Sequence, residues 1–338
     1  MSSEALVVGE AWISEHYFTT DGKGASFQAR VIERRKKWDE LEAAGHSSPR
    51  SRFSSSRAVL EKAFARLGDG IDLDPSSIRE DISGPILELL GFTRSSSRLM
   101  QWESTGPLHV LTRVADASPE IAIIEAKPVE SLDDLLSRDV DTLLEPYLPE
   151  GEETPARDRI NSAARLLSTL FLDDEAPRFA LVIAGSQLLL AERERWPEGR
   201  YLAVDLQVVV ARNESKRGGE VDRALACVAE DAFGVDEEGT SWWERVLDES
   251  VKHTVGVSSE LREGVRLSIE IIANDVVQRR ALQGLDPLPA EQAQPLAKQS
   301  LRFLYRILFL LYAEASPELQ VLPVGAEAVS YTHLRAHE

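Results

Sequence analysis

The stretch that most constrains the fold is residues 107–128, PLHVLTRVADASPEIAIIEAKP, in which two apolar runs flank a turn cluster near Ala117. Two β-branched runs around a short turn predict a β-hairpin. Because side chains alternate between the two faces of a strand, Glu125 and Lys127 share one face of the second arm. A carboxylate and an ammonium group at the end of a buried strand are costly unless they meet water, a metal ion or each other. The pair is therefore either a candidate site or, as at the end of many strands, two solvated side chains.

Composition favours a protein of the reducing cytoplasm with two or so domains. The chain has 338 residues, 43% of them hydrophobic, which is enough for a sizeable core. Its single cysteine, Cys227, excludes an internal disulfide, and we expect it to be a buried helix residue rather than a nucleophile. The N-terminus lacks a secretory signal pattern. The longest apolar run, residues 303–313, is interrupted by Arg306 and is too short to span a bilayer, so we predict no membrane association.

The charge is unevenly distributed along the chain. A net charge of −19 argues against bulk electrostatic binding to DNA, but the first hundred residues are nearly neutral. We predict an N-terminal helical and basic region over residues 1–74, with a helix over 27–43 and a Ser/Pro loop over 45–56. Its basic side chains either contact DNA phosphates or form a solvated helix face. The candidate DNA-binding residues are Arg34, Arg35, Lys36, Lys37, Arg50 and Arg52.

Residues 75–212 alternate between helical and strand patterns. The predicted elements, in chain order, are a helix ending at Gly91, a strand over 98–103, the two arms of the hairpin, a helix over 156–172, and strands over 179–183, 187–192 and 201–210. The acidic, turn-rich residues 129–155 interrupt this order, and we interpret them as a surface insertion. The order predicts an α/β sandwich built on a mixed sheet.

Residues 213–328 are predicted to be an all-α connector domain. Helices are expected over 220–233, 241–254 and 259–283, the second opened by a capping box of Ser241 and Glu244. Trp242 and Trp243 are expected to pack within the helical region rather than to stack on bases.

The segment 299–315, QSLRFLYRILFLLYAEA, is apolar nearly all round, as in a helix that is buried. We expect a further domain to cover this helix. In its absence, the exposed patch should include Phe303, Leu304, Leu308 or Leu311.

The last ten residues, VSYTHLRAHE, resemble the in-frame translation of a sequencing adapter. We therefore leave residues 329–338 out of the fold. On this interpretation the natural chain continues past Ala328.

The hairpin ending in Glu-Ala-Lys, and the helix–strand–strand–strand–helix–strand order around it, resemble the PD-(D/E)xK nucleases. That resemblance implies a nuclease-like α/β (α+β) sandwich over residues 75–212. It also implies that Glu125 is a ligand of Mg²⁺ and that Lys127 orients the attacking water or stabilises the charge on phosphorus.

Three further phrases, RFALVIAGSQLLLAERERW, RYLAVDLQVVV and SLRFLYRILFLLYAEA, resemble parts of type IIG-like restriction–modification proteins. In such proteins a nuclease-like domain and a helical connector precede a DNA adenine methyltransferase domain. The resemblance implies double-stranded DNA as a partner and a role in cytoplasmic defence against foreign DNA. The Gly-rich S-adenosylmethionine loop and the Asn-Pro-Pro-Tyr motif are both absent, so S-adenosylmethionine would bind only a downstream methyltransferase domain.

The hairpin departs from the nuclease pattern in one respect. The metal-binding Asp should lie opposite Glu125, near His109, where the sequence has no acid. Asp116 is expected at the turn, far from the site. The remaining candidates for a second metal-binding carboxylate are Glu103 and Glu88. The alternative to a Mg²⁺-dependent endonuclease is therefore an inactive scaffold that binds DNA or a partner.

Overall fold

A computed structural model describes residues 4–19, 26–68, 74–92, 97–102, 106–111, 121–147, 159–236 and 239–315. The chain divides into two compact units, Met1–Thr254 and Val255–Glu338. Glu103, Asp116 and the adapter-like residues 329–338 lie outside the described residues.

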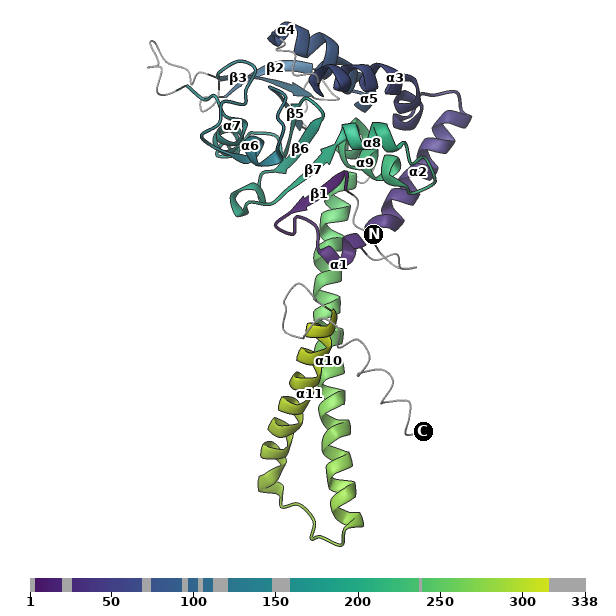
Figure 1. The fold of residues 1–338 in the computed structure, drawn as a ribbon, viewed down its shortest axis with the longest axis vertical. Coiled ribbons are helices and arrows are strands. Elements are labelled where there is room, and N and C mark those ends of the chain that lie inside the picture. The colour runs from purple at the N-terminus through teal and green to yellow at the C-terminus, as the bar shows by residue number, and fades with distance from the viewer. Residues whose placement is uncertain are drawn as a thin grey trace. The chain divides into compact units, whose positions relative to one another are not determined.

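The first unit is built on one mixed sheet of seven strands (Figure 1). In spatial order the strands are β1 (Leu6–Gly9), β7 (Tyr201–Asp205), β6 (Gln187–Glu192), β5 (Phe179–Ala184), β4 (Ile121–Ala126), β3 (Gly106–Leu111) and β2 (Ser97–Trp102). The neighbours β4 and β5 are parallel, and the other neighbouring pairs are antiparallel. The predicted mixed sheet is thus confirmed, and β4 is an interior strand.

The predicted hairpin is formed by β3 and β4, but in a different register. Ile123 lies opposite His109, where we expected Glu125. Continuing this register places Glu125 level with Pro107, two residues from the predicted position. Because side chains alternate along a strand, a shift of two residues leaves Glu125 on the predicted face. The position opposite Glu125 still offers no carboxylate.

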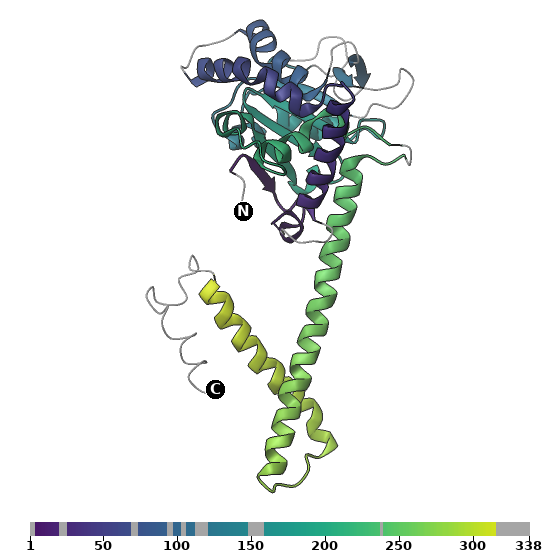
Figure 2. The ribbon, with the colours of Figure 1, turned by 90° about the vertical axis from the view of Figure 1, so that its right-hand side faces the viewer.

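Helices cover both faces of the sheet. On one face the core contains β4 residues such as Ala122 and Ile124, together with α6 (Leu132–Leu136) and α7 (Ala163–Leu170). On the other face Ile121 and Ile123 share a larger core with several helices. These are α2 (Phe27–Ala43), α3 (Pro49–Gly68), α5 (Gly84–Leu90), α8 (Leu206–Arg212) and α9 (Glu220–Val228). In Figure 2 the purple α2 and α3 lie across the teal strands.

Short elements complete the first unit. They are α1 (Glu15–Thr19), α4 (Pro75–Ile78), the π-helical turn η1 (Arg79–Ser83), and the 3-10 turns η3 (Trp196–Glu198) and η4 (Glu230–Ala232). The predicted helix stop at Gly91 is confirmed, since Gly91 is the C-cap of α5 with φ of 89°. A Cβ atom there would also lie 2.5 Å from Arg52 Nη2, so a larger residue would be both strained and crowded.

Two predicted boundaries are wrong because capping groups outweigh residue propensities. Residues 206–210 form the start of α8 instead of continuing a strand, since the side chain of Asp205 accepts hydrogen bonds from Gln207 N (2.9 Å) and Val208 N (3.2 Å). Helix α3 begins at Pro49, inside the predicted loop. Ser48 Oγ accepts from two amides of its first turn, and proline suits that turn.

A single helix, α10 (Trp242–Leu282), replaces the two helices predicted over 241–254 and 259–283. The predicted capping box is present: Glu244 N donates to Ser241 Oγ (3.2 Å) and Ser241 N donates to Glu244 Oε2 (2.7 Å). Trp243 is buried in the large core, as expected of a packing residue. Residues 213–254, which we grouped with the helical connector, therefore belong to the sheet-containing unit.

The second unit contains the rest of α10, the 3-10 turn η5 (Ala290–Gln292) and α11 (Ala293–Ala315). Phe303, Leu308 and Leu311 are exposed on α11, as predicted. Within the described ranges, no helix has the length and apolar character needed to cross a membrane.

Candidate functional site at the end of strand β4

Glu125 and Lys127 lie at the carboxyl end of β4 but take different partners. Glu125 is the one half-buried residue in a strand whose other side chains are buried. Its Oε2 accepts a hydrogen bond from Arg79 Nε at 3.0 Å. Lys127 follows the strand, and its Nζ donates to Asp141 Oδ1 at 2.9 Å. Each charge at the strand end is thus paired with a residue from another part of the chain.

The segment 141–147 lies against the end of β4. Lys127 N donates to Thr142 O (2.7 Å), and Ala126 and Leu143 form an antiparallel bridge. Tyr147 forms a second bridge, to Ile160. We call these residues the acidic strap, because they carry Asp141 and Glu145 to the candidate site. The strap is part of the region we predicted to be a surface insertion, which is why sequence analysis did not consider its carboxylates.

Arg79 links Glu125 to the acidic strap. It begins the π-helical turn η1, and its Nη1 donates to Glu145 Oε1 at 2.9 Å while its Nε donates to Glu125. The hydrogen bond with Glu145, and then that with Glu125, raises the pKa of Arg79 against the opposing effect of burial. One guanidinium group therefore pairs with two carboxylates, and the three side chains together keep one negative charge. Irregular π-helical turns are often found at functional sites.

The second oxygen of Glu125 lacks a partner within the described ranges. Glu125 Oε1 is buried and accepts no hydrogen bond from any described residue. Close by, burial and then the charge of Glu125 raise the pKa of Tyr147 to about 12, so this phenol stays protonated near neutral pH. A buried carboxylate oxygen without a donor is unfavourable by about 1–3 kcal/mol or more. Glu125 is therefore a position where a further cation or hydrogen-bond donor would be stabilising.

The carboxylates at this site fit a magnesium ion only in part. Mg²⁺ is commonly held by one or two protein carboxylates together with water and phosphate oxygens. Glu125 and Glu145 are ligands of that type, but Arg79 supplies the positive charge between them. Among the described residues, no group of three or more His, Cys, Asp or Glu side chains is placed to hold a metal ion.

A cleft of about 1080 Å³ opens beside the site. It lies where β4, β5 and β7 end and where α3 ends and α4 and α8 begin. Its wall is lined by Leu67, Gly68, Asp74, Pro75, Ile78, Lys127, Pro128, Val129, Glu130, Leu144, Ser186, Gln187, Asp205 and Gln207. Ligands of α/β proteins often bind at the carboxyl ends of parallel strands, the position of this cleft relative to β4 and β5. Its charged lining residues are Lys127 and three carboxylates, Asp74, Glu130 and Asp205.

The other predicted metal ligands, Glu88 and Glu103, stay untested as partners of Glu125. Glu88 is exposed on α5, and no hydrogen bond or ion pair among the described residues joins its carboxylate to Glu125. Glu103 lies outside the described residues. The carboxylates that do approach the strand end are Asp141 and Glu145.

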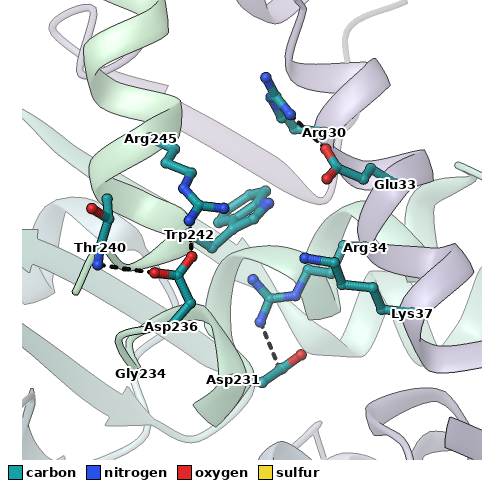
Figure 3. A pocket seen from close by; sticks show the side chains of 10 residues that line it. All are labelled: Arg30, Glu33, Arg34, Lys37, Asp231, Gly234, Asp236, Thr240, Trp242 and Arg245. Atoms are coloured by element: carbon teal, nitrogen blue, oxygen red, sulfur yellow. Dashed lines mark hydrogen bonds and ion pairs between the residues drawn. The ribbon is translucent and has the colours of Figure 1, made fainter. Parts of the chain in front are cut away.

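Arg34, assigned to DNA from the sequence, is an interior residue. Only 4% of its side chain is exposed, and its Nη2 lies 2.6 Å from Asp231 Oδ1. Its guanidinium group also packs against the rings of Trp38 and Trp242. In Figure 3 it points toward Asp231 within a small pocket of about 110 Å³, which Lys37 also lines. Arg34 thus connects α2, η4 and α10.

Three more of the predicted DNA contacts are engaged within the protein. Arg35 and Arg50 both donate to buried Asp222, at 3.0 and 3.1 Å. Arg52 donates to the carbonyl oxygen of Leu89 at 2.9 Å, and burial lowers its pKa.

The exposed members of the predicted DNA-binding set are Lys36 and Lys37. Lys36 lies 3.8 Å from Glu40. Any phosphate contact by this set would fall mainly to these two lysines.

Comparison with known proteins adds no further assignment. No family model matches the chain, and no curated protein or solved structure is significantly similar to it.

Proposed function

We propose that this chain is the nuclease-like and connector part of a DNA restriction–modification protein, and that the cleft beside β4 faces double-stranded DNA. The observation that carries the proposal is the position of Glu125 and Lys127 at the end of an interior strand. That strand lies in the order α5, β2, β3, β4, α6, α7 and β5. Apart from the short helix α6, this order resembles the helix–strand–strand–strand–helix–strand succession of the PD-(D/E)xK nucleases. In the proposed protein a downstream adenine methyltransferase domain binds S-adenosylmethionine, and the whole acts in cytoplasmic defence.

In this proposal Glu125 and a strap carboxylate, Glu145, would hold Mg²⁺. When bound, the ion would supply Lewis-acid stabilisation of charge on the phosphate. Lys127, on the wall of the cleft, stabilises the developing negative charge or orients water. Arg79 pairs with both carboxylates and so competes with the ion for them, and a DNA phosphate is a suitable new partner for its guanidinium group.

A second candidate function, an inactive scaffold that binds DNA or a partner, is favoured by the same ion pairs. Arg79 pairs with Glu125 and Glu145, and Asp141 pairs with Lys127. Charges that are already paired need no metal ion. The two functions share a fold and differ in whether Arg79 leaves Glu125.

Plasmid nicking in the presence of Mg²⁺ tests the proposal. Wild-type protein should nick supercoiled DNA, whereas Glu125→Gln and Lys127→Ala should lose cleavage. Lys127→Ala should keep most of its DNA affinity, because the lost interaction acts in the transition state. Glu175→Gln is the matched control, since Glu175 is an exposed carboxylate that precedes β5, the strand parallel to β4, and so lies toward the opposite end of the sheet.

Two results would count against the nuclease. The first is equal activity of Glu125→Gln and Glu175→Gln. The second is no cleavage by the wild type on varied DNA substrates, including with S-adenosylmethionine supplied. Retained DNA affinity in that second case would support the scaffold.

A further inference from the structure

Helix α11 presents large apolar side chains to solvent along its second half. Eight of them are between 39% and 60% exposed. They are Phe303, Tyr305, Ile307, Leu308, Phe309, Leu310, Leu311 and Tyr312. Single exposed apolar residues are normal on protein surfaces, but a continuous run of this kind marks an interaction site.

These side chains are distributed around the helix rather than along one stripe. At about 100° per residue, they cover roughly three quarters of the circumference. The remaining stripe carries Arg302 and Arg306. A helix that is apolar nearly all round is normally buried among several neighbouring helices. One packing partner is not enough to cover α11.

The described part of the second unit supplies at most one such neighbour. In Figure 2, α11 diverges from α10 instead of lying along it. Leu267 and Ile271, one turn apart on α10, are 44% and 69% exposed. Both helices of this hairpin therefore have apolar surface that no described residue covers.

The exposed area is the size of a stable protein interface. Taking about 200 Å² for each fully exposed large side chain, eight half-exposed residues present roughly 800 Å². The largest apolar patch on a typical monomer is about 300–600 Å². A standard interface buries about 800 Å² on each partner.

We propose that α10 and α11 associate with the same two helices of a second copy of this chain, forming a twofold-symmetric four-helix bundle. Symmetric pairing gives each α11 the further neighbours that its circumference requires, because it adds both an α10 and an α11. The stripe with Arg302 and Arg306 faces solvent in this bundle. The association does not depend on the nuclease or scaffold function of the first unit.

Size-exclusion chromatography with light scattering, and sedimentation velocity, test this proposal over a wide micromolar concentration range. The expected species has twice the 37.5 kDa mass of the chain. The double variant Leu308→Glu/Leu311→Glu should be monomeric. The matched control, Arg302→Glu/Arg306→Glu, introduces the same two carboxylates into the polar stripe and should remain dimeric.

Hydrogen exchange provides a test that needs no substitution. Amides of residues 293–315 should exchange more slowly as the protein concentration rises, since dimerisation would protect α11. A wild-type monomer at all concentrations overturns the proposal. Polydisperse aggregation, or a dimer that survives Leu308→Glu/Leu311→Glu, does so equally.

Discussion

Substituting Asp222 by Asn should strongly destabilise the first unit. Asp222 is fully buried on α9 and accepts hydrogen bonds from Arg35 Nη1 (3.0 Å), Arg50 Nη1 (3.1 Å) and Gly218 N (2.8 Å). It thereby joins α9 to α2 and to α3. Asparagine has nearly the same shape and can still accept a hydrogen bond, but it removes the negative charge that two arginines share.

The size of the effect follows from the exposure of the two arginines. Removing one member of a buried ion pair costs about 3–5 kcal/mol. The side chains of Arg35 and Arg50 are 14% and 20% exposed, so water stabilises part of their charge after the substitution. Arg35 also keeps its ion pair with Asp39. We therefore expect a loss of about 2–3 kcal/mol in the free energy of unfolding, somewhat below the range for fully buried pairs.

Urea denaturation followed by tryptophan fluorescence measures this loss. For a slope of about 2–3 kcal/mol per molar urea, the midpoint should fall by roughly 1 M. Asp139→Asn is the matched control, because Asp139 is exposed, and its midpoint should stay nearly unchanged. If Asp222→Asn shifts the midpoint no more than the control, Arg35 and Arg50 are not held by this carboxylate. A loss of DNA affinity without loss of stability in Arg50→Met would restore the phosphate-contact assignment.

Two other predictions concern titratable groups of the first unit. Burial acts to raise the pKa of Asp231, but the charge of Arg34 and hydrogen bonds from Arg34 and Trp38 outweigh it and lower the pKa. The carboxylate therefore contributes stability above its unfolded pKa of about 3.9, and this contribution disappears as the pH falls through the folded pKa. Asp231→Asn should flatten the acid side of a stability–pH profile from urea melts, and an unchanged acid side would contradict the assignment. Burial raises the pKa of the Cys227 thiol, so alkylation should be slow in the native protein and fast in urea; rapid native labelling would show that Cys227 is accessible.

The sequence predicted correctly those helices, strands and turns whose signals come from residues close together in the chain. Alternation of apolar residues predicted the hairpin, and a tight turn predicted strand β6. A glycine that tolerates positive φ predicted the end of helix α5 at Gly91. The capping box of α10 is equally local. The wrong prediction of a strand over residues 206–210 also has a local cause. Asp205 caps a helix there, although the residues that follow are partly β-branched.

The partners of charged residues could not be predicted in this way. The basic run in α2 is compatible with a solvated, DNA-facing helix, and only the packing of α2 against α9 and η4 shows where its arginines point. Arg34 reaches Asp231, and Arg35 reaches Asp222, across nearly two hundred residues of sequence. Arg79 and the acidic strap meet Glu125 through the same kind of long-range packing. No periodicity or spacing in a single sequence encodes these pairs.

If the nuclease proposal holds, the pairing of Arg79 with Glu125 should couple the binding of Mg²⁺ to the binding of DNA. A metal ion held by both Glu125 and Glu145 competes with Arg79 for these carboxylates, which disfavours Mg²⁺ binding by the free protein. A DNA phosphate near Arg79 would offer the guanidinium group a new partner and so lower that cost. By thermodynamic reciprocity, Mg²⁺ should then strengthen DNA binding by the same factor. Fluorescence anisotropy of a labelled duplex, at constant ionic strength with and without Mg²⁺, measures this factor. In wild type the affinity should rise with Mg²⁺, and in Glu125→Gln the rise should vanish. Equal affinities with and without Mg²⁺ in the wild type would mean that Arg79 stays on Glu125, as the scaffold function requires.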